Sequence, residues 1–196
     1  MGNEEAVMPF INAANSGGGY HAGDEDTIRQ VIELCLRYNV EIGAHPSFRD
    51  KENFGRTAMH LKAEETVQLV TEQLVLFHTI ALRCGGKLHH VKPHGALYNM
   101  AAKDAALGRA IAQAVKDFDD SLIYYGLSGS VMISEAEALG LETANEVFAD
   151  RTYQPDGSLT PRSASNALLT DVNDVVQQVK KFVNENKVVT VRGSVI

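Results

Sequence analysis

The sequence predicts an α/β protein whose parallel strands alternate with helices, in a sheet that is either doubly wound or closed into a barrel. Short apolar segments alternate with longer segments in which apolar residues recur every three or four positions. Neighbouring strand-like segments are separated by helices and not by hairpin turns, which favours parallel pairing. His21, His45 and His94 follow the ends of such strands, where both architectures bind their ligands.

The composition is that of one globular domain over residues 1–196. Hydrophobic residues make up 44% of the chain and charged residues 22%, which are ordinary values. The net charge is −7 and the chain has no long basic run, which argues against a nucleic-acid partner and against an anchor on an anionic membrane. We therefore expect small-molecule chemistry.

Cysteine usage and the N-terminal segment indicate the cytoplasm. Cys35 and Cys84 lack CxxC spacing and are expected to be buried thiols, which suits a reducing compartment. No apolar run approaches the roughly 20 residues of a membrane span. The first residues lack the basic flank and apolar core of a signal peptide.

The first half of the chain predicts two strands and two helices. Residues 9–15 form the expected first strand, and a glycine-rich turn follows it. Apolar spacing predicts a helix over residues 27–38, for which Asp24 is either the N-cap or a site residue. The second strand covers residues 40–44 and ends at His45. A long helix covers residues 63–84.

The second half continues the alternation around a central strand at residues 88–92. Expected after it are a helix at 103–118, a strand at 122–126, a helix at 130–139, a strand at 142–146, a helix at 171–186 and a strand at 187–192. The loop at 147–162 is long and rich in charge, and such loops are commonly functional or disordered.

The central strand carries the most informative side chains. His90, Lys92 and, if the extended backbone continues, His94 share one face. As ordinary core residues, the histidines would be satisfied by hydrogen bonds and Lys92 would reach solvent. Alternatively, His21, His45 and His94 could bind a divalent metal or share acid–base work. The chain has no HxxxH or HExxH spacing, so a metal site would need three distant loops to converge.

A cationic lining is the second chemical expectation. Lys92, Arg56, Arg151 and Arg162 lie in or near the predicted site loops and suit an anionic substrate with a carboxylate or phosphate. Any single Arg could instead be a solvated surface group or an ion-pair partner.

These motifs together resemble the LamB/YcsF family, whose members are also called the A subunit of 5-oxoprolinase. The segments that carry the resemblance are H-A-G-D at 21–24, G-A-H-P at 43–46, F-G-R at 54–56, H-V-K-P-H-G-A-L-Y at 90–98 and E-V-F-A-D-R-x-Y-x-x-D-G-x-L-x-P-R at 146–162. The resemblance implies an irregular seven-stranded α/β barrel related to polysaccharide deacetylases. It also implies ATP-dependent cleavage of 5-oxoproline to L-glutamate together with separate B and C subunits.

The resemblance implies a set of site residues and cofactors. The implied pocket residues are His21, Asp24, His45, Lys92, His94, Glu146, Asp150, Arg151 and Arg162. Together with Arg56 from the cationic lining, we expect them to divide into catalytic residues (Lys92, His94, Glu146 and Asp150) and substrate-binding residues (His21, Asp24, His45, Arg56, Arg151 and Arg162). ATP with Mg would be shared with the partner subunits. A bound divalent metal at His21, His45 and His94 stays open at this point.

The chain departs from the family pattern in three places. The family's opening D-L-N-C-D-x-G-E segment and closing V-H-G-D segment are absent, and Ser16-Gly17-Gly18 replaces the usual I-A-C. We therefore expect a single barrel-like domain that lacks the family's first strand and its last strand segment. An unpaired sheet edge would favour pairing with a second copy of the chain.

Two alternatives to an ATP-dependent lactam-opening subunit remain. One is a metal-dependent amide hydrolase of the deacetylase type. The other is a non-catalytic subunit that binds the substrate and presents it to partner subunits.

Overall fold

The structure is a computed structural model that describes residues 4–196, and these residues form two compact units. Unit 1 contains the chain up to Gly126 together with residues 131–144, and unit 2 contains residues 127–130 and 145–196. Each unit has its own internal packing. The predicted single domain over residues 1–196 stays a prediction.

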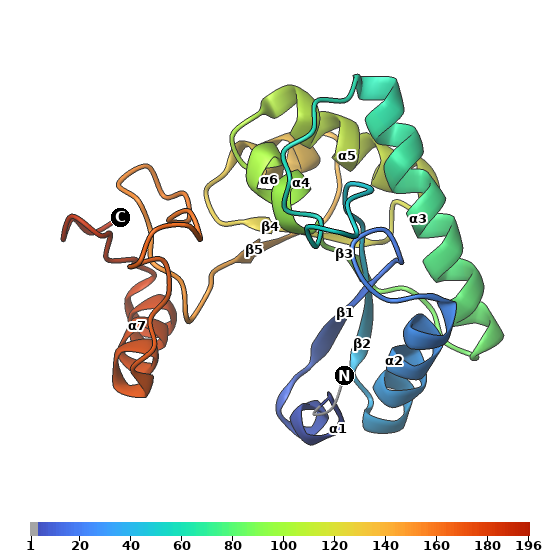
Figure 1. Cartoon of the computed structure of the whole chain (residues 1–196), viewed down its shortest axis with the longest axis horizontal. Helices are drawn as coiled ribbons and strands as arrows, with labels where there is room; N and C mark the ends of the chain where they lie inside the picture. The colour runs from blue at the N-terminus through green and yellow to red at the C-terminus, as the bar shows by residue number, and fades with distance from the viewer. Residues whose placement is uncertain (1–3) are drawn as a thin grey trace. The chain divides into compact units, whose positions relative to one another are not determined.

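A five-stranded sheet is the centre of the fold (Figure 1). Its strands are β1 (Ala13–Gly17), β2 (Glu41–His45), β3 (His90–Val91), β4 (Ile123–Leu127) and β5 (Thr143–Glu146), in the spatial order β1-β2-β3-β4-β5. The pairs β1–β2, β2–β3 and β3–β4 are parallel. The predicted parallel α/β class is confirmed, and the described residues contribute five strands of the seven that the resemblance implies.

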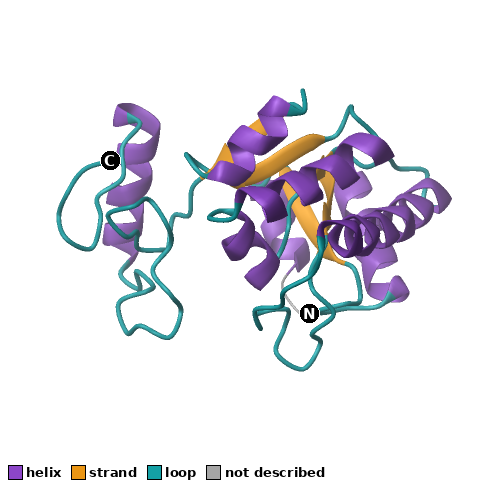
Figure 2. Ribbon diagram, turned by 90° about the horizontal axis from the view of Figure 1, so that it is seen from above, coloured by secondary structure: helices purple, strands orange, loops and turns teal. Residues whose placement is uncertain are grey.

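Helices connect these strands and pack around the sheet (Figure 2). In unit 1 they are α1 (Glu4–Val7), the 3-10 turn η1 (Met8–Phe10), α2 (Glu25–Tyr38), α3 (Ala63–Arg83), α4 (Gly95–Ala101), α5 (Ala105–Phe118) and α6 (Val131–Ala138). The apolar stripe predicted for the long helix is real, since Val70, Leu74 and Phe77 of α3 have no exposed surface. Helix α3 packs against α5, and α5 packs against α6.

Two predicted element boundaries and one predicted strand were wrong. The first strand begins at Ala13 because Pro9, which has no backbone N–H, lies in η1. Helix α5 begins only after Asp104, which caps it by accepting from Leu107 N, and α4 precedes it as a separate helix. The strand predicted at 187–192 is instead one arm of a tight turn at Gly193 (φ +79°), which brings Val195 opposite Val189.

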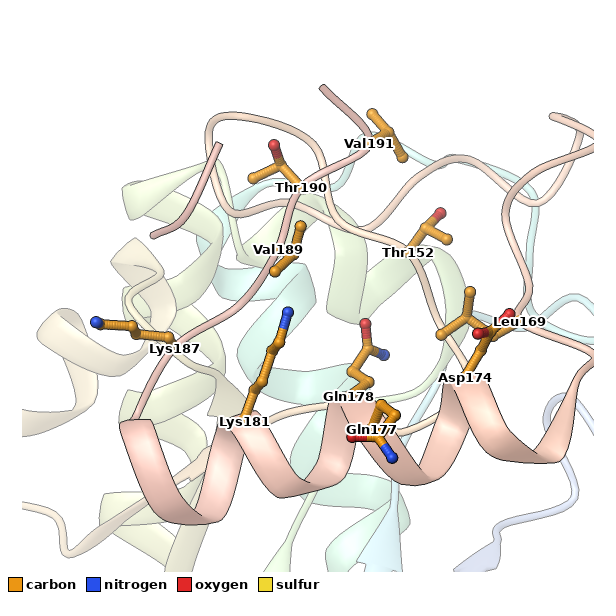
Figure 3. Close-up of a pocket in the computed structure, with 10 residues that line it drawn as sticks. All are labelled: Thr152, Leu169, Asp174, Gln177, Gln178, Lys181, Lys187, Val189, Thr190 and Val191. Atoms are coloured by element: carbon orange, nitrogen blue, oxygen red, sulfur yellow. The ribbon is translucent and has the colours of Figure 1, made fainter. Parts of the chain in front are cut away.

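Unit 2 includes the charged loop and helix α7 (Val172–Glu185). Gln178 of α7 holds the loop, since its side-chain amide donates to the main-chain carbonyls of Phe148, Ala149 and Arg151. A cavity of about 310 Å³ lies between α7 and the segment 187–191 (Figure 3). Across residues 4–196, no helix has both the length and the apolar character required for a membrane span.

Candidate active site

A cavity of about 1070 Å³ in unit 1 extends along β1, from α1 and η1 before this strand to the carboxyl ends of β1 and β2. Three imidazoles, the ring of Phe54 and the polar side chains of β1 are part of its lining. The residues from these groups are His21, His45, His94, Phe54, Asn15 and Ser16. This edge of the sheet is where a parallel α/β fold binds ligands, because the loops after successive strands meet there.

The three histidines predicted from separate loops touch one another. The rings of His21 and His94 are stacked with centroids 3.8 Å apart, and His45 and His94 meet edge to face at 4.7 Å. His94 Nδ1 and His45 Nε2 are 2.9 Å apart, which is hydrogen-bond distance. His45 is the last residue of β2, and His94 is the N-cap of α4, so two element ends position the pair.

Proton counting defines the charge of the His45–His94 pair. At its two ends the pair meets main-chain carbonyls, with His45 Nδ1 2.5 Å from Lys92 O and His94 Nε2 2.9 Å from Phe54 O. Carbonyl oxygens only accept, so these two contacts and the His45–His94 bond need three protons. Two neutral imidazoles carry two protons. All three hydrogen bonds therefore form together only when the pair carries one positive charge.

Within this pair, the surroundings disfavour a positive charge on His45. Burial, and then the neighbouring His94, lower the pKa of His45 well below its usual value. When all three hydrogen bonds form, a neutral His45 donates from Nδ1 and accepts at Nε2, and His94 donates from both of its nitrogens.

His21 is the second neutral imidazole of the cluster. Its pKa is lowered to about 4, first by burial and then by His94. His21 Nδ1 lies 2.8 Å from the hydroxyl of Ser47. A Cβ on Gly17 would come within 2.9 Å of His21 Nε2, so a glycine at this position leaves room for the ring.

A tight loop covers the imidazoles of His21 and His94. The ring of Phe54 meets both of them edge to face, with centroids 5.4 Å and 5.2 Å away. Phe54 and Gly55 both have positive φ, at 57° and 67°. A Cβ on Gly55 would come 2.8 Å from His21 Cβ, so the close approach requires glycine.

The carboxylate of Asp50 fixes this loop. It accepts from Thr57 N at 2.9 Å and from the side-chain amide of Asn53 at 2.8 Å. Burial raises the pKa of Asp50, but the hydrogen bonds from Thr57 and Asn53 outweigh it and lower the pKa to about 2. Asp50 therefore remains an acceptor throughout the physiological pH range.

Other predicted residues of unit 1 lie near this cluster or in local contacts. The positive charge of Lys92 contributes to the lowered pKa values of His45 and His90. Asp24 is exposed and caps α2 by accepting from Thr27 N at 2.8 Å, as one of its two interpretations predicted. The guanidinium of Arg56 lies 5.1 Å from the centre of the Phe54 ring. The substrate-binding roles of Asp24 and Arg56 stay predictions.

The remaining predicted residues, Glu146, Asp150, Arg151 and Arg162, belong to unit 2. Arg151 is only 5% exposed and donates from Nε to Ala167 O and from Nη2 to Thr160 O. These bonds give its guanidinium a structural role within the loop. Arg162 is exposed. The functional roles of these four residues stay predictions.

The ring nitrogens of the histidine cluster decide whether it fits the predicted metal. Among residues 4–196, no three or more His, Cys, Asp or Glu side chains are arranged to hold a metal ion. The ring nitrogens of His45 and His94 face each other and two main-chain carbonyls. In this arrangement the three histidines do not fit a metal, so we derive no step through one.

Sequence reasoning missed five residues that build the site. Gln73 was detectable, because it is a polar residue within the apolar stripe of the long helix. The D-x-x-N spacing of Asp50 and Asn53 is typical of a turn. Nothing in the sequence singled out Ser47 or Asn15.

The fold and the site define a class of α/β proteins that bind a small molecule at the carboxyl ends of parallel strands. The chain belongs to the LamB/YcsF family, whose sequence profile matches residues 1–196. This finding confirms the resemblance drawn from the motifs.

The match covers most of the length of the named relatives. A protein from Bordetella pertussis that is named as the A subunit of 5-oxoprolinase is 50% identical over 196 residues, which is 100% of this chain and 78% of the relative. A protein of the same name from Shouchella clausii is 50% identical over 99% of this chain and 77% of its own length. The crystal structure of a lactam utilization protein from Thermus thermophilus matches with a TM-score of 0.92 and 37% identity, over 100% of this chain and 79% of that one.

Proposed function

We propose that this chain is the A subunit of a 5-oxoprolinase, which opens the lactam of 5-oxoproline to give L-glutamate. The relatives that are named as A subunits of 5-oxoprolinase support this function, since two of them are 50% identical over nearly the whole chain. The structural observation that carries the proposal is the hydrogen-bonded His45–His94 pair beside His21 in one cavity. A site with three clustered imidazoles can both bind an anion and move a proton.

The charge of the cavity suits the proposed substrate. 5-Oxoproline carries a carboxylate, and His94 in its protonated form, together with the ammonium of Lys92, would supply positive charge near β2 and β3. Either cation can bind the carboxylate or stabilise an oxyanion that develops at the lactam carbonyl. Arg56, Arg151 and Arg162 are further proposed cations for substrate or phosphate.

The proposed reaction couples ring opening to ATP with Mg, shared with the proposed B and C partner subunits. Transfer of the γ-phosphoryl group to the lactam oxygen activates the ring carbon. Water then adds to that carbon, the ring C–N bond breaks, and the amine takes a proton. A second water releases phosphate, so the products are glutamate, ADP and phosphate. His94 in its neutral form or Glu146 is the proposed general base for water, and Asp150 is the proposed further carboxylate.

Reconstitution tests this proposal. The full chain, mixed with B and C subunits from a related organism, should release glutamate and ADP from 5-oxoproline and ATP. Lys92→Ala and His94→Ala should each lower the rate by about a hundredfold or more. No glutamate, while a longer family member is active under the same conditions, contradicts the assignment. Near-normal rates in both variants would instead favour a non-catalytic substrate-binding subunit.

A metal-dependent amide hydrolase is the alternative proposal. It shares the three converging imidazoles, but it requires the ring nitrogens of His45 and His94 to leave their present hydrogen bonds. Elemental analysis of protein prepared without chelator separates it from the first. The candidate requires close to one metal per chain, and a content below about 0.1 per chain removes it.

A further inference from the structure

We infer that Gln73 and Ser47 are positioning residues that hold His21 with its ring proton on Nδ1, which leaves Nε2 as a proton acceptor beside the cavity. The inference rests on the proposed function only for its catalytic consequence. It extends the site to a residue of α3, which lies 52 positions after His21 in the chain.

The side-chain amide of Gln73 is completely enclosed and fully used. It has no exposed surface, although its neighbours on the buried face of α3 are apolar. Its Oε1 accepts from Ser47 N at 3.0 Å, and its Nε2 donates to Ser47 O at 3.0 Å and to Leu69 O at 2.9 Å. Gln73 therefore binds both main-chain groups of Ser47. Burying a side-chain amide among apolar residues is costly unless it has such hydrogen-bond partners. The main effect of the Gln73 amide is to fix the position of Ser47.

The hydroxyl of Ser47 then determines the tautomer of His21. Ser47 also has no exposed surface, and its hydroxyl donates to the carbonyl of Phe48 at 3.0 Å. A hydroxyl has one proton to donate, so towards His21 Nδ1, 2.8 Å away, it acts as the acceptor. His21 must then carry its proton on Nδ1. Burial keeps the ring neutral by lowering its pKa to about 4.

The other ring nitrogen is consequently unprotonated. His21 lines the cavity, and its Nε2 approaches Gly17 at the end of β1, where a Cβ would come within 2.9 Å. Adjacent to it, His94 is stacked on the same ring at 3.8 Å. A bare Nε2 can accept a proton or a hydrogen bond from water or from a substrate N–H or O–H, while burial and the neighbouring His94 keep its pKa at about 4. Under the proposed function, His21 is therefore a third candidate for the general base, beside His94 and Glu146.

Nitrogen NMR of the full chain tests the tautomer without any activity assay. The protein is labelled with ¹⁵N-histidine, and the His21 signals are assigned by their loss in His21→Gln. At pH 7 we expect a protonated Nδ1 and a bare Nε2 for His21. A proton on Nε2, or an equal mixture of the two tautomers, overturns the inference. This outcome is independent of whether the chain cleaves 5-oxoproline.

Two variants test the positioning residues. Ser47→Ala removes the acceptor for Nδ1–H, and Gln73→Met removes the amide while keeping a side chain of similar length. Each should produce a mixture of His21 tautomers and lower kcat of the reconstituted complex about tenfold or more, with KM changed less than threefold. Unchanged tautomer ratios in both folded variants contradict the inference.

Gln68→Met is the matched control for Gln73→Met. Gln68 lies on the exposed side of the same helix, and its side-chain amide donates to the carboxylate of Glu72 at 2.9 Å. It should leave the His21 signals and kcat unchanged. A tautomer change in this control as large as in Gln73→Met would overturn the assignment to Gln73. If Gln73→Met does not fold, the conservative Gln73→Glu, which retains the Oε1 acceptor for Ser47 N, replaces it under the same criteria.

Discussion

The imidazole of His90 lies directly against the backbone of Gly43, where a Cβ would come only 2.1 Å from His90 Nε2. The two residues are paired in the register of β2 and β3, so they point to the same face of the sheet. His90 also hydrogen-bonds Asn15 of β1 at 3.1 Å and stacks on Tyr125 of β4 at 4.4 Å. A polar layer thus crosses four neighbouring strands, with the buried ring of His90 in the middle.

Replacing Gly43 with alanine should destabilise the protein because the added methyl group displaces the His90 ring. We expect a loss of about 1–3 kcal/mol in the free energy of unfolding, measured by urea denaturation. In a His90→Ala background the same substitution should cost less than about 0.5 kcal/mol. Equal costs in the two backgrounds would show that ring contact is not the cause.

Stability should fall as the pH is lowered from about 6.5 to about 4. Burial is the main cause that lowers the pKa of both His21 and His90 to about 4, so the folded state holds fewer protons than the unfolded state in this interval. The stabilisation is complete above pH 6.5 and is lost as the pH falls towards the folded pKa. Each histidine contributes a slope of at most about 1.4 kcal/mol per pH unit.

Urea unfolding at several pH values measures this slope. His90→Gln should reduce it, whereas the exposed His60→Gln should not. A slope unchanged by His90→Gln would mean that other groups govern the acid sensitivity.

Removing the charge of Asp50 should loosen the Phe54 loop. In Asp50→Asn, an amide nitrogen replaces one of the two carboxylate oxygens. The side chain then has one acceptor oxygen and cannot accept from both Thr57 N and the side chain of Asn53. We expect amide hydrogen exchange at Thr57 and Gly55 to accelerate about tenfold or more, with the β-strands unaffected. Asp26→Asn, on the exposed first turn of α2, is the control. Equal protection of the loop in both variants would contradict a fixing role for Asp50.

Arg151 should be required for the stability of unit 2. Arg151→Met leaves the buried carbonyl of Thr160 without this donor, at about 1–3 kcal/mol, while Ala167 O keeps Thr152 N as a donor. The matched Arg162→Met, at an exposed position, should change the free energy of unfolding by less than about 0.5 kcal/mol. Protease sensitivity of residues 147–170, followed by mass spectrometry, reports this difference. Similar sensitivity in both variants would contradict the structural role.

The sequence was informative where periodicity and strand ends determine position. The parallel sheet and the convergence of His21, His45 and His94 followed from the rule that loops after parallel strands meet at one edge. The finer geometry depends on tertiary hydrogen bonds that no local pattern encodes. Ser47, for example, is important because Gln73 of another helix holds it. The last predicted strand failed because Gly193 permits a turn that apolar alternation does not reveal.

The contact between His94 Nε2 and the carbonyl of Phe54 has a consequence for ligand entry. The carbonyl of Gly55 also accepts from Ala96 N at the start of α4. The loop that contains Phe54 and Gly55 is therefore hydrogen-bonded both to His94 and to the helix that His94 caps. A ligand that takes the Nε2 proton of His94 must leave Phe54 O without its donor. Occupancy of the cavity and the conformation of a surface loop are therefore thermodynamically linked, and a molecule that binds one will change the population of the other.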